Sequence, residues 1–180
     1  DVRDMTQKEL RDKLGYVPQK GVLFSGTIDS NIRYGKPEIT DAQVKEAAEV
    51  AQATEFIDTK PKKYESPVSQ GGTNVSGGQK QRLSIARAIA KEPEIFIFDD
   101  SFSALDFKTD SQLRKALKEY TKDATTVIVA QRISTILGAD QIIVLDDGHM
   151  AGIGTHKELM ANCEVYQQIA RSQLSEEELA

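Results

Sequence analysis

The sequence of 180 residues contains one cysteine, Cys163, and two histidines, His149 and His156. A single cysteine cannot form a disulfide within the chain, and two histidines with one cysteine are too few donors for a typical structural zinc site. The sequence therefore excludes a small disulfide-stabilised domain and disfavours a zinc-binding module. We expect a protein of a reducing, cytoplasmic compartment.

The chain also has no long apolar run and no excess of basic residues. Its longest apolar stretches, such as residues 95–98, are far shorter than the roughly 20 residues that cross a bilayer, and its first residues lack the pattern of a signal peptide. We therefore expect any role at a membrane to depend on another segment or subunit. With 23 Lys and Arg against 28 Asp and Glu, the formal net charge is −5, which argues against nucleic acid as a partner.

Hydrophobic residues make up 39% of the sequence, which is enough for one domain with a core of its own. Three apolar runs, at residues 94–99, 126–129 and 141–146, predict buried strands. Apolar positions at helical spacing lie between these runs, so we expect a parallel, doubly wound α/β layer. The pair Asp147-Gly148 is a turn signal and predicts a hairpin with a return strand over residues 149–153.

The other segments are predicted to be helical. From about residue 27 to residue 90 the pattern is helical without a strand, which predicts a small helical subdomain ahead of the strand at 94–99. We expect a final helix over residues 165–174, followed by an acidic, frayed end after Ser175. Four pairs have the spacing of a capping box, in which two side chains satisfy free amides at a helix start: Thr6 with Glu9, Thr40 with Gln43, Ser76 with Gln79 and Thr155 with Glu158.

Two short segments carry residues suited to phosphate chemistry. Ser76, Gly77 and Gly78 begin a helix whose first-turn amides bear almost no side chains, and such a terminus can receive a phosphate. A flexible loop before an amphipathic helix is the simpler interpretation of these three residues alone. Asp99 and Asp100 end an apolar strand, where one acid can reach a magnesium ion and its neighbour the attacking water. Taken alone, two acids at a strand end more often begin a solvated loop.

Five motifs in order resemble those of the nucleotide-binding domain of ABC transporters. The resemblance covers residues 1–174 and implies a P-loop NTPase-like parallel sheet core with an inserted helical subdomain. On this basis residues 1–180 are one partial domain, with the subdomain at 27–90 and the C-terminal part of the α/β core at 91–175. The motifs are the Q-loop at 16–19, a stretch typical of exporters at 21–28, the signature sequence at 75–79, the Walker B strand at 95–99 and the D-loop at 103–106.

The resemblance also implies roles for single residues and an activity for the whole. ATP and Mg²⁺ are the implied cofactors, and export driven by ATP hydrolysis at the cytoplasmic face of a membrane is the implied function. The implied partners are a transmembrane domain and a second nucleotide-binding domain, which join in a head-to-tail dimer where the signature acts on the partner's ATP. The implied magnesium ligands are Gln19 and Asp99. The implied nucleotide-binding residues are Gln19, Ser76, Gly77, Gly78 and Gln79. The implied catalytic residues are Asp100, Gln131 and Asp106.

Single residues allow simpler interpretations as well. Gln19 alone is typical of a turn after Pro18, and Asp106 is typical of a cap on the helix that begins near Phe107, a role compatible with the D-loop. His149 and His156 are each expected at the surface.

Three departures from the family pattern matter. No Gly-x-x-x-x-Gly-Lys-Ser/Thr occurs, so we interpret the chain as an N-terminally truncated fragment and expect it to be inactive alone. Asp100 stands where the family usually has glutamate, and Gln131 stands where it has a histidine that contacts the γ-phosphate. The last two departures, beside an intact signature, indicate the degenerate half of a heterodimeric multidrug or lipid exporter. Gln70, which stands where homodimeric exporters commonly have an acid, adds weaker support.

Three other functions are weighed against this one. An SMC-type chromosome ATPase has a long coiled coil between its Q-loop and signature, whereas Gln19 and Ser76 are 57 positions apart (76 − 19) without sustained heptads. A non-catalytic interaction module that uses only the dimer fold remains open for the isolated chain. A soluble ABC protein that acts on ribosomes is disfavoured by the acidic balance and by the exporter-like stretch 24–27.

Overall fold

The computed structural model describes residues 1–175, and their contacts divide them into two compact units. The first unit is formed by residues 1–129, and the second starts at residue 130. The acidic end predicted after Ser175 lies outside the described residues. The predicted division into a subdomain at 27–90 and a core part at 91–175 stays a prediction.

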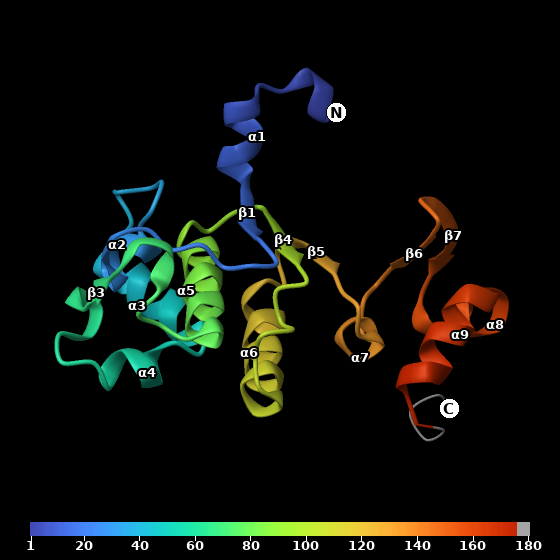
Figure 1. Cartoon of the computed structure of the whole chain (residues 1–180). Coiled ribbons are helices and arrows are strands. Elements are labelled where there is room, and N and C mark those ends of the chain that lie inside the picture. Colours follow the sequence, from blue (N-terminus) through green and yellow to red (C-terminus); the bar gives the residue numbers. More distant parts are fainter. Residues whose placement is uncertain (176–180) are drawn as a thin grey trace. The chain divides into compact units, whose positions relative to one another are not determined.

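The first unit contains a three-stranded parallel sheet, which packs against its helices (Figure 1). Its order is β1 (Leu14–Val17), β4 (Ile95–Asp99) and β5 (Thr125–Val129). Tyr16 lies opposite Ile97 in the register of β1 with β4. The sheet confirms the parallel α/β core predicted from the sequence.

Within the first unit, only one face of this sheet is covered. On that face Val17, Phe96 and Phe98 are buried in one apolar core, which continues into the helices α5 (Gly77–Ala90) and α6 (Phe107–Tyr120). On the other face Tyr16, Val127 and Val129 are 55%, 47% and 52% exposed. The prediction that residues 126–129 are a buried strand is therefore wrong, because β5 is the last strand of this sheet and its Val127 and Val129 lie on the face that the first unit leaves uncovered.

The helices of the predicted subdomain pack around α5, which lies between them and the sheet (Figure 1). One prediction is corrected here, since two very short strands pair antiparallel in a segment expected to have none. A fifth capping box, formed by Thr27 and Ser30, accompanies the four predicted ones, all of which are confirmed. The remaining elements of this unit are η1 (Val2–Asp4), α1 (Gln7–Lys13), β2 (Gly26–Thr27), α2 (Ile28–Ile32), α3 (Asp41–Val50), α4 (Thr54–Asp58), η2 (Lys63–Glu65), β3 (Pro67–Val68) and η3 (Gln70–Gly72).

The second unit contains the predicted hairpin. Asp147 and Gly148 both have positive φ, +46° and +79°, as a two-residue turn of type I′ requires. This turn joins β6 (Ile142–Asp146) to β7 (His149–Gly154), and the two strands form a separate antiparallel sheet. The expectation that residues 141–146 extend the parallel sheet is therefore corrected. The two-residue turn brings β7 back beside β6 as its antiparallel neighbour.

The described part of the second unit also contains three helices: α7 (Ile133–Ile136), α8 (His156–Asn162) and α9 (Glu164–Gln173). The small core includes Leu159 and Tyr166. His156 is half-buried and its Nδ1 lies 2.8 Å from the Tyr166 hydroxyl oxygen, so the prediction of a surface histidine is wrong at this position. His149 is exposed, as predicted. Among the described residues, no helix combines the length and the apolar character that a membrane span requires.

Candidate functional site

Three of the predicted site residues lie together where β1 and β4 end. Because parallel strands end at the same edge of a sheet, Gln19 after β1 lies close to the acids at the end of β4. The side-chain Nε2 of Gln19 donates a hydrogen bond to Oδ2 of Asp100, 3.2 Å away. Asp99 and Asp100 are both half-buried, while Gln19 is exposed.

Asp99 has a partner that the sequence did not reveal. The hydroxyl of Tyr16 donates to Oδ2 of Asp99 over 3.1 Å, and this bond to a carboxylate raises the pKa of Tyr16. The register of β1 with β4 explains this contact, because Tyr16 lies opposite Ile97 and therefore on the same face of the sheet as Asp99.

The oxygen atoms at this edge are suitable ligands for a magnesium ion that also binds a nucleotide. The described residues contain no group of three or more His, Cys, Asp or Glu able to hold a metal by themselves. Magnesium in nucleotide sites is held by one or two carboxylates together with phosphate oxygens and water. The carboxylate of Asp99 and the amide oxygen of Gln19 supply the small number of protein ligands that such a magnesium ion needs.

The turn after β4 is fixed by hydrogen bonds to its neighbours. Asp100 has a φ of +42°, in the left-handed region where Asp and Asn are the commonest residues after glycine. Its backbone N–H donates to the carbonyl of Val129, at 2.9 Å. The buried hydroxyl of Ser101 donates to the carbonyl of Val17, also at 2.9 Å. The turn is thus tied to both neighbouring strands, which determines where the Asp100 carboxylate lies.

The predicted signature residues form the start of α5. Ser76 Oγ accepts from the Gln79 N–H, and Gln79 Oε1 accepts from the Ser76 N–H, both at 3.2 Å. The Gln79 side chain is therefore engaged in the cap. The amides of Gly77 and Gly78 are not used by the capping box, and a Cβ added at Gly77 would meet no atom within 4 Å. Two amides of the first turn thus remain for an outside acceptor.

The D-loop residues lie next to this helix start. A Cβ placed on Gly78 would lie 3.5 Å from the carbonyl oxygen of Ala104. Asp106 caps α6, as predicted, because its carboxylate accepts from the N–H and the hydroxyl of Thr109, at 2.9 and 2.7 Å. These two bonds lower the pKa of Asp106. Its catalytic role stays a prediction.

Gln131 belongs to the second unit. It precedes α7, and its backbone carbonyl accepts a hydrogen bond from Nε2 of Gln173 over 2.9 Å. Its predicted role beside Asp100 stays a prediction.

One buried residue near the site was missed by the sequence argument. Gln81 on α5 is 1% exposed and uses both ends of its amide. Oε1 accepts from the N–H of Gly21 at 3.1 Å, and Nε2 donates to the carbonyl of Pro18 at 3.2 Å. The only sequence signal is a glutamine that precedes a run of buried apolar positions, which does not reveal a partner.

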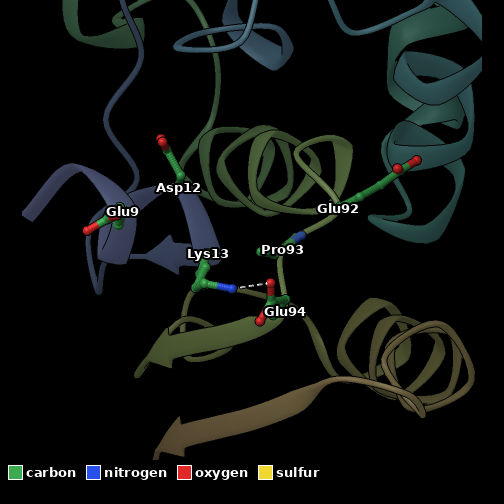
Figure 2. A pocket seen from close by; sticks show the side chains of 6 residues that line it. All are labelled: Glu9, Asp12, Lys13, Glu92, Pro93 and Glu94. Atoms are coloured by element: carbon green, nitrogen blue, oxygen red, sulfur yellow. Dashed lines mark hydrogen bonds and ion pairs between the residues drawn. The ribbon is translucent and has the colours of Figure 1, made fainter. Parts of the chain in front are cut away.

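A shallow pocket of about 360 Å³ lies elsewhere, at the edge where the strands begin (Figure 2). Lys13 precedes β1 and forms an ion pair with Glu94, which precedes β4. Ligands of open α/β sheets bind at the opposite, carboxyl edge. None of the predicted site residues lines this pocket, which is formed by Glu9, Asp12, Lys13, Glu92, Pro93 and Glu94.

Comparisons with known proteins give one consistent family. The sequence matches the family model described as ABC transporter over residues 1–103. An uncharacterized ABC transporter ATP-binding protein of Mycobacterium bovis is 46% identical over 176 residues, which cover 96% of this chain and 30% of that protein. A Staphylococcus aureus protein, whose name is that of a multidrug export ATP-binding/permease protein, is 44% identical over 169 residues, 94% of this chain and 29% of its own length.

A solved structure agrees with these relatives. A bacterial Atm1-family ABC exporter with ATP bound superposes with a TM-score of 0.93 at 39% identity, covering 98% of this chain and 31% of that chain. The chain thus spans about 30% of the length of the curated relatives it matches. The family model matches 103 of the 180 residues, and the fold agrees with that of the solved exporter at a TM-score of 0.93. The chain therefore belongs to the ABC transporter family and corresponds to part of its nucleotide-binding domain.

Proposed function

We propose that this chain is part of the ATPase of an exporter and that the start of α5 completes an ATP site held mainly by a partner domain. The observation that carries the proposal is the first turn of α5. It contains no acidic residue, whereas the other three helices with a predicted capping box carry Glu9, Asp41 and Glu158 there.

An acid in the first turn usually compensates the positive end of the helix dipole. In α5 that end is left for another anion. Ser76 and Gly77 are exposed, and a Cβ built on Gly77 would meet no atom within 4 Å. A phosphate group of ATP has the charge and the acceptor oxygens that such a terminus binds. The solved exporter that this chain resembles contains ATP, which supports the same ligand here.

At the edge of the parallel sheet we propose a second, weaker nucleotide site. Asp99 and Gln19 would hold a magnesium ion, which neutralises phosphate charge when bound with ATP. Asp100 would orient the attacking water, but its side chain is shorter than glutamate by one methylene, about 1.5 Å. Since a misplacement of about 1 Å can reduce a rate roughly 100-fold, Asp100 is a poor general base. Together with Gln131 in place of histidine, this supports the degenerate half of a heterodimer.

The partners follow from the same proposal. Hydrolysis is a property of the complete transporter, in which a transmembrane domain and a second nucleotide-binding domain join this chain at the cytoplasmic face of a membrane. The loop after Gln19 and the region of α2 expose Val22 and Tyr34, which are 51% and 54% exposed. These side chains offer an apolar contact for a helix of the transmembrane domain.

The proposal is tested by steady-state ATPase rates of the complete heterodimer with single substitutions. Ser76→Arg should reduce turnover by about 100-fold or more, because it places a bulky cation at the amides that complete the competent site. Thr40→Arg is the matched control, since Thr40 heads the same kind of capping box on α3, and it should leave turnover nearly unchanged. Asp100→Ala should reduce turnover less than about threefold, because truncating a side chain that contributes little to hydrolysis costs little of the rate.

Two results would contradict the proposal. If Ser76→Arg behaves like Thr40→Arg, the start of α5 does not complete an ATP site. If Asp100→Ala abolishes turnover as fully as Ser76→Arg, Asp100 is a working catalytic carboxylate and the degenerate-half hypothesis is wrong.

A further inference from the structure

The loop that carries Gln19 is attached to α5 along its length. Gln81 holds it on both sides of Gln19, at the carbonyl of Pro18 and at the N–H of Gly21. Six residues further along the helix, Arg87 Nη1 donates to the carbonyl of Val22 at 2.9 Å. Residues 18–22, named the strap here, are therefore hydrogen-bonded to the helix whose first turn contains the signature glycines.

The fit between strap and helix is close at Gly21. A Cβ added there would lie 2.8 Å from Ser84 Oγ and 3.0 Å from the carbonyl oxygen of Lys80. Any larger residue would push the strap away from α5. The absence of a side chain at Gly21 is what lets its N–H approach Gln81.

The chemistry of Gln81 matches this task. The strap presents one acceptor, the carbonyl of Pro18, and one donor, the N–H of Gly21. A carboxamide offers a donor and an acceptor on one planar group, whereas an acid or an amine offers only one kind at neutral pH. Because Gln81 is 1% exposed, water cannot easily replace it, and an apolar side chain would leave both backbone groups without these partners.

We infer that Gln81 is a positioning residue that fixes Gln19 relative to the signature helix, so that the two motifs move as one body. The inference rests on the proposed function, in which Gln19 is a magnesium ligand and the start of α5 binds a phosphate. A movement of α5 toward a partner's nucleotide is then transmitted through Gln81 to Gln19 and changes its distance from Asp99 and Asp100.

The test is a double-mutant cycle in the complete transporter between Gln81→Met and Gln19→Ala. Methionine has the length of glutamine but makes neither hydrogen bond. The measured quantity is the Mg²⁺ concentration that gives half-maximal retention of ATP at this chain's site. Each single substitution should raise it about tenfold, and the double substitution should raise it no further than Gln19→Ala alone, because Gln81 acts through Gln19.

Two further variants separate positioning from a general loss of stability. Gly21→Ala leaves Gln81 intact but displaces the strap, so it should also raise the Mg²⁺ requirement and serves if Gln81→Met does not fold. Ser84→Ala is the matched control, because the Ser84 hydroxyl is buried next to the strap without a hydrogen-bond partner, and it should leave the Mg²⁺ requirement unchanged.

The inference is overturned if Gln81→Met and Gly21→Ala leave the Mg²⁺ requirement unchanged while Gln19→Ala raises it, or if the effects of Gln81→Met and Gln19→Ala simply multiply. If Gln19→Ala itself has no effect, the proposed magnesium role of Gln19 is wrong and the inference falls with it. These patterns distinguish the failure of the positioning role from the failure of the proposed function.

Discussion

Gln19 and Asp100 are 81 positions apart in the sequence, and the structure joins them by a hydrogen bond of 3.2 Å from Nε2 to Oδ2. In the proposed nucleotide site, this bond joins the magnesium ligand Gln19 to the carboxylate that would orient the attacking water. It therefore provides a starting point for testing whether the two substitutions, Asp100 for glutamate and Gln131 for histidine, limit hydrolysis.

Asp100→Glu combined with Gln131→His should raise hydrolysis at this chain's site. The longer carboxylate restores about 1.5 Å of reach, and the histidine restores a group that can carry a proton. The gain should be of the order of 100-fold if placement is the limiting defect. Single-turnover hydrolysis, measured in the complete heterodimer with the partner's site inactivated, gives the rate. An unchanged rate in the double variant would show that neither defect is limiting.

Arg87 is expected to stabilise the contact between α2, the strap and α5. Its guanidinium donates to the backbone and side-chain oxygens of Asn31, at 2.8 and 3.0 Å, and lies 5.4 Å from the ring centroids of Phe24 and Tyr34. Arg87→Lys should lower the free energy of unfolding by about 1–3 kcal/mol, because an ammonium cannot make the forked contacts and leaves acceptors unpaired.

Urea unfolding of the complete nucleotide-binding domain measures this loss. Arg171→Lys is the control, because Arg171 is exposed on α9, and its effect should stay within about 0.5 kcal/mol. Equal effects of the two substitutions would mean that the Arg87 contacts contribute no more than an exposed arginine.

The cap at Asp106 should make stability depend on acidic pH. Hydrogen bonds from the backbone and side chain of Thr109 lower the pKa of Asp106 in the folded state. The stabilisation is therefore fully present above the unfolded pKa of about 3.9 and is lost as the pH falls through the lower folded pKa. Asp106→Asn keeps an acceptor at the cap without titrating, so it should remove this part of the pH dependence.

Denaturant unfolding of the nucleotide-binding domain at several values between about pH 3 and pH 6 tests the prediction. The difference in stability between the parent and Asp106→Asn should shift in favour of Asp106→Asn as the medium becomes more acidic. A difference that stays constant over the whole range would show that the cap does not titrate in the expected way.

Cysteines at Val22 and Tyr34 should form crosslinks with a cytoplasmic loop of the transmembrane domain. Both side chains are more than half exposed; Val22 is the last residue of the strap, and Tyr34 follows α2. The experiment requires Cys163→Ser in the background, although Cys163 is buried. A cysteine at exposed Glu119 on α6 is the control and should not crosslink. Failure of both positions in every nucleotide state would count against the exporter role.

Features that depend on neighbours in the sequence could be predicted from the sequence alone. The four capping boxes pair residues three positions apart, and the Asp147-Gly148 turn needs only two residues that tolerate positive φ. The motif order also predicted which residues belong to the candidate site. Of these, Gln19, Asp99 and Asp100 do lie at one edge of the sheet, because parallel strands end together.

The tertiary structure decided which groups meet across long stretches of chain. Tyr16 reaches Asp99 across 83 positions, and Gln81 reaches Gly21 and Pro18 across 60 and 63. It also decided that the sheet is covered on one face and that β6 pairs with β7. The physical reason is that capping and turn preferences act within about four residues, whereas burial and long-range hydrogen bonds depend on how helices and strands pack. The sequence shows only that Gln81 is polar. The approach of the strap to α5 gives its amide two hydrogen-bond partners.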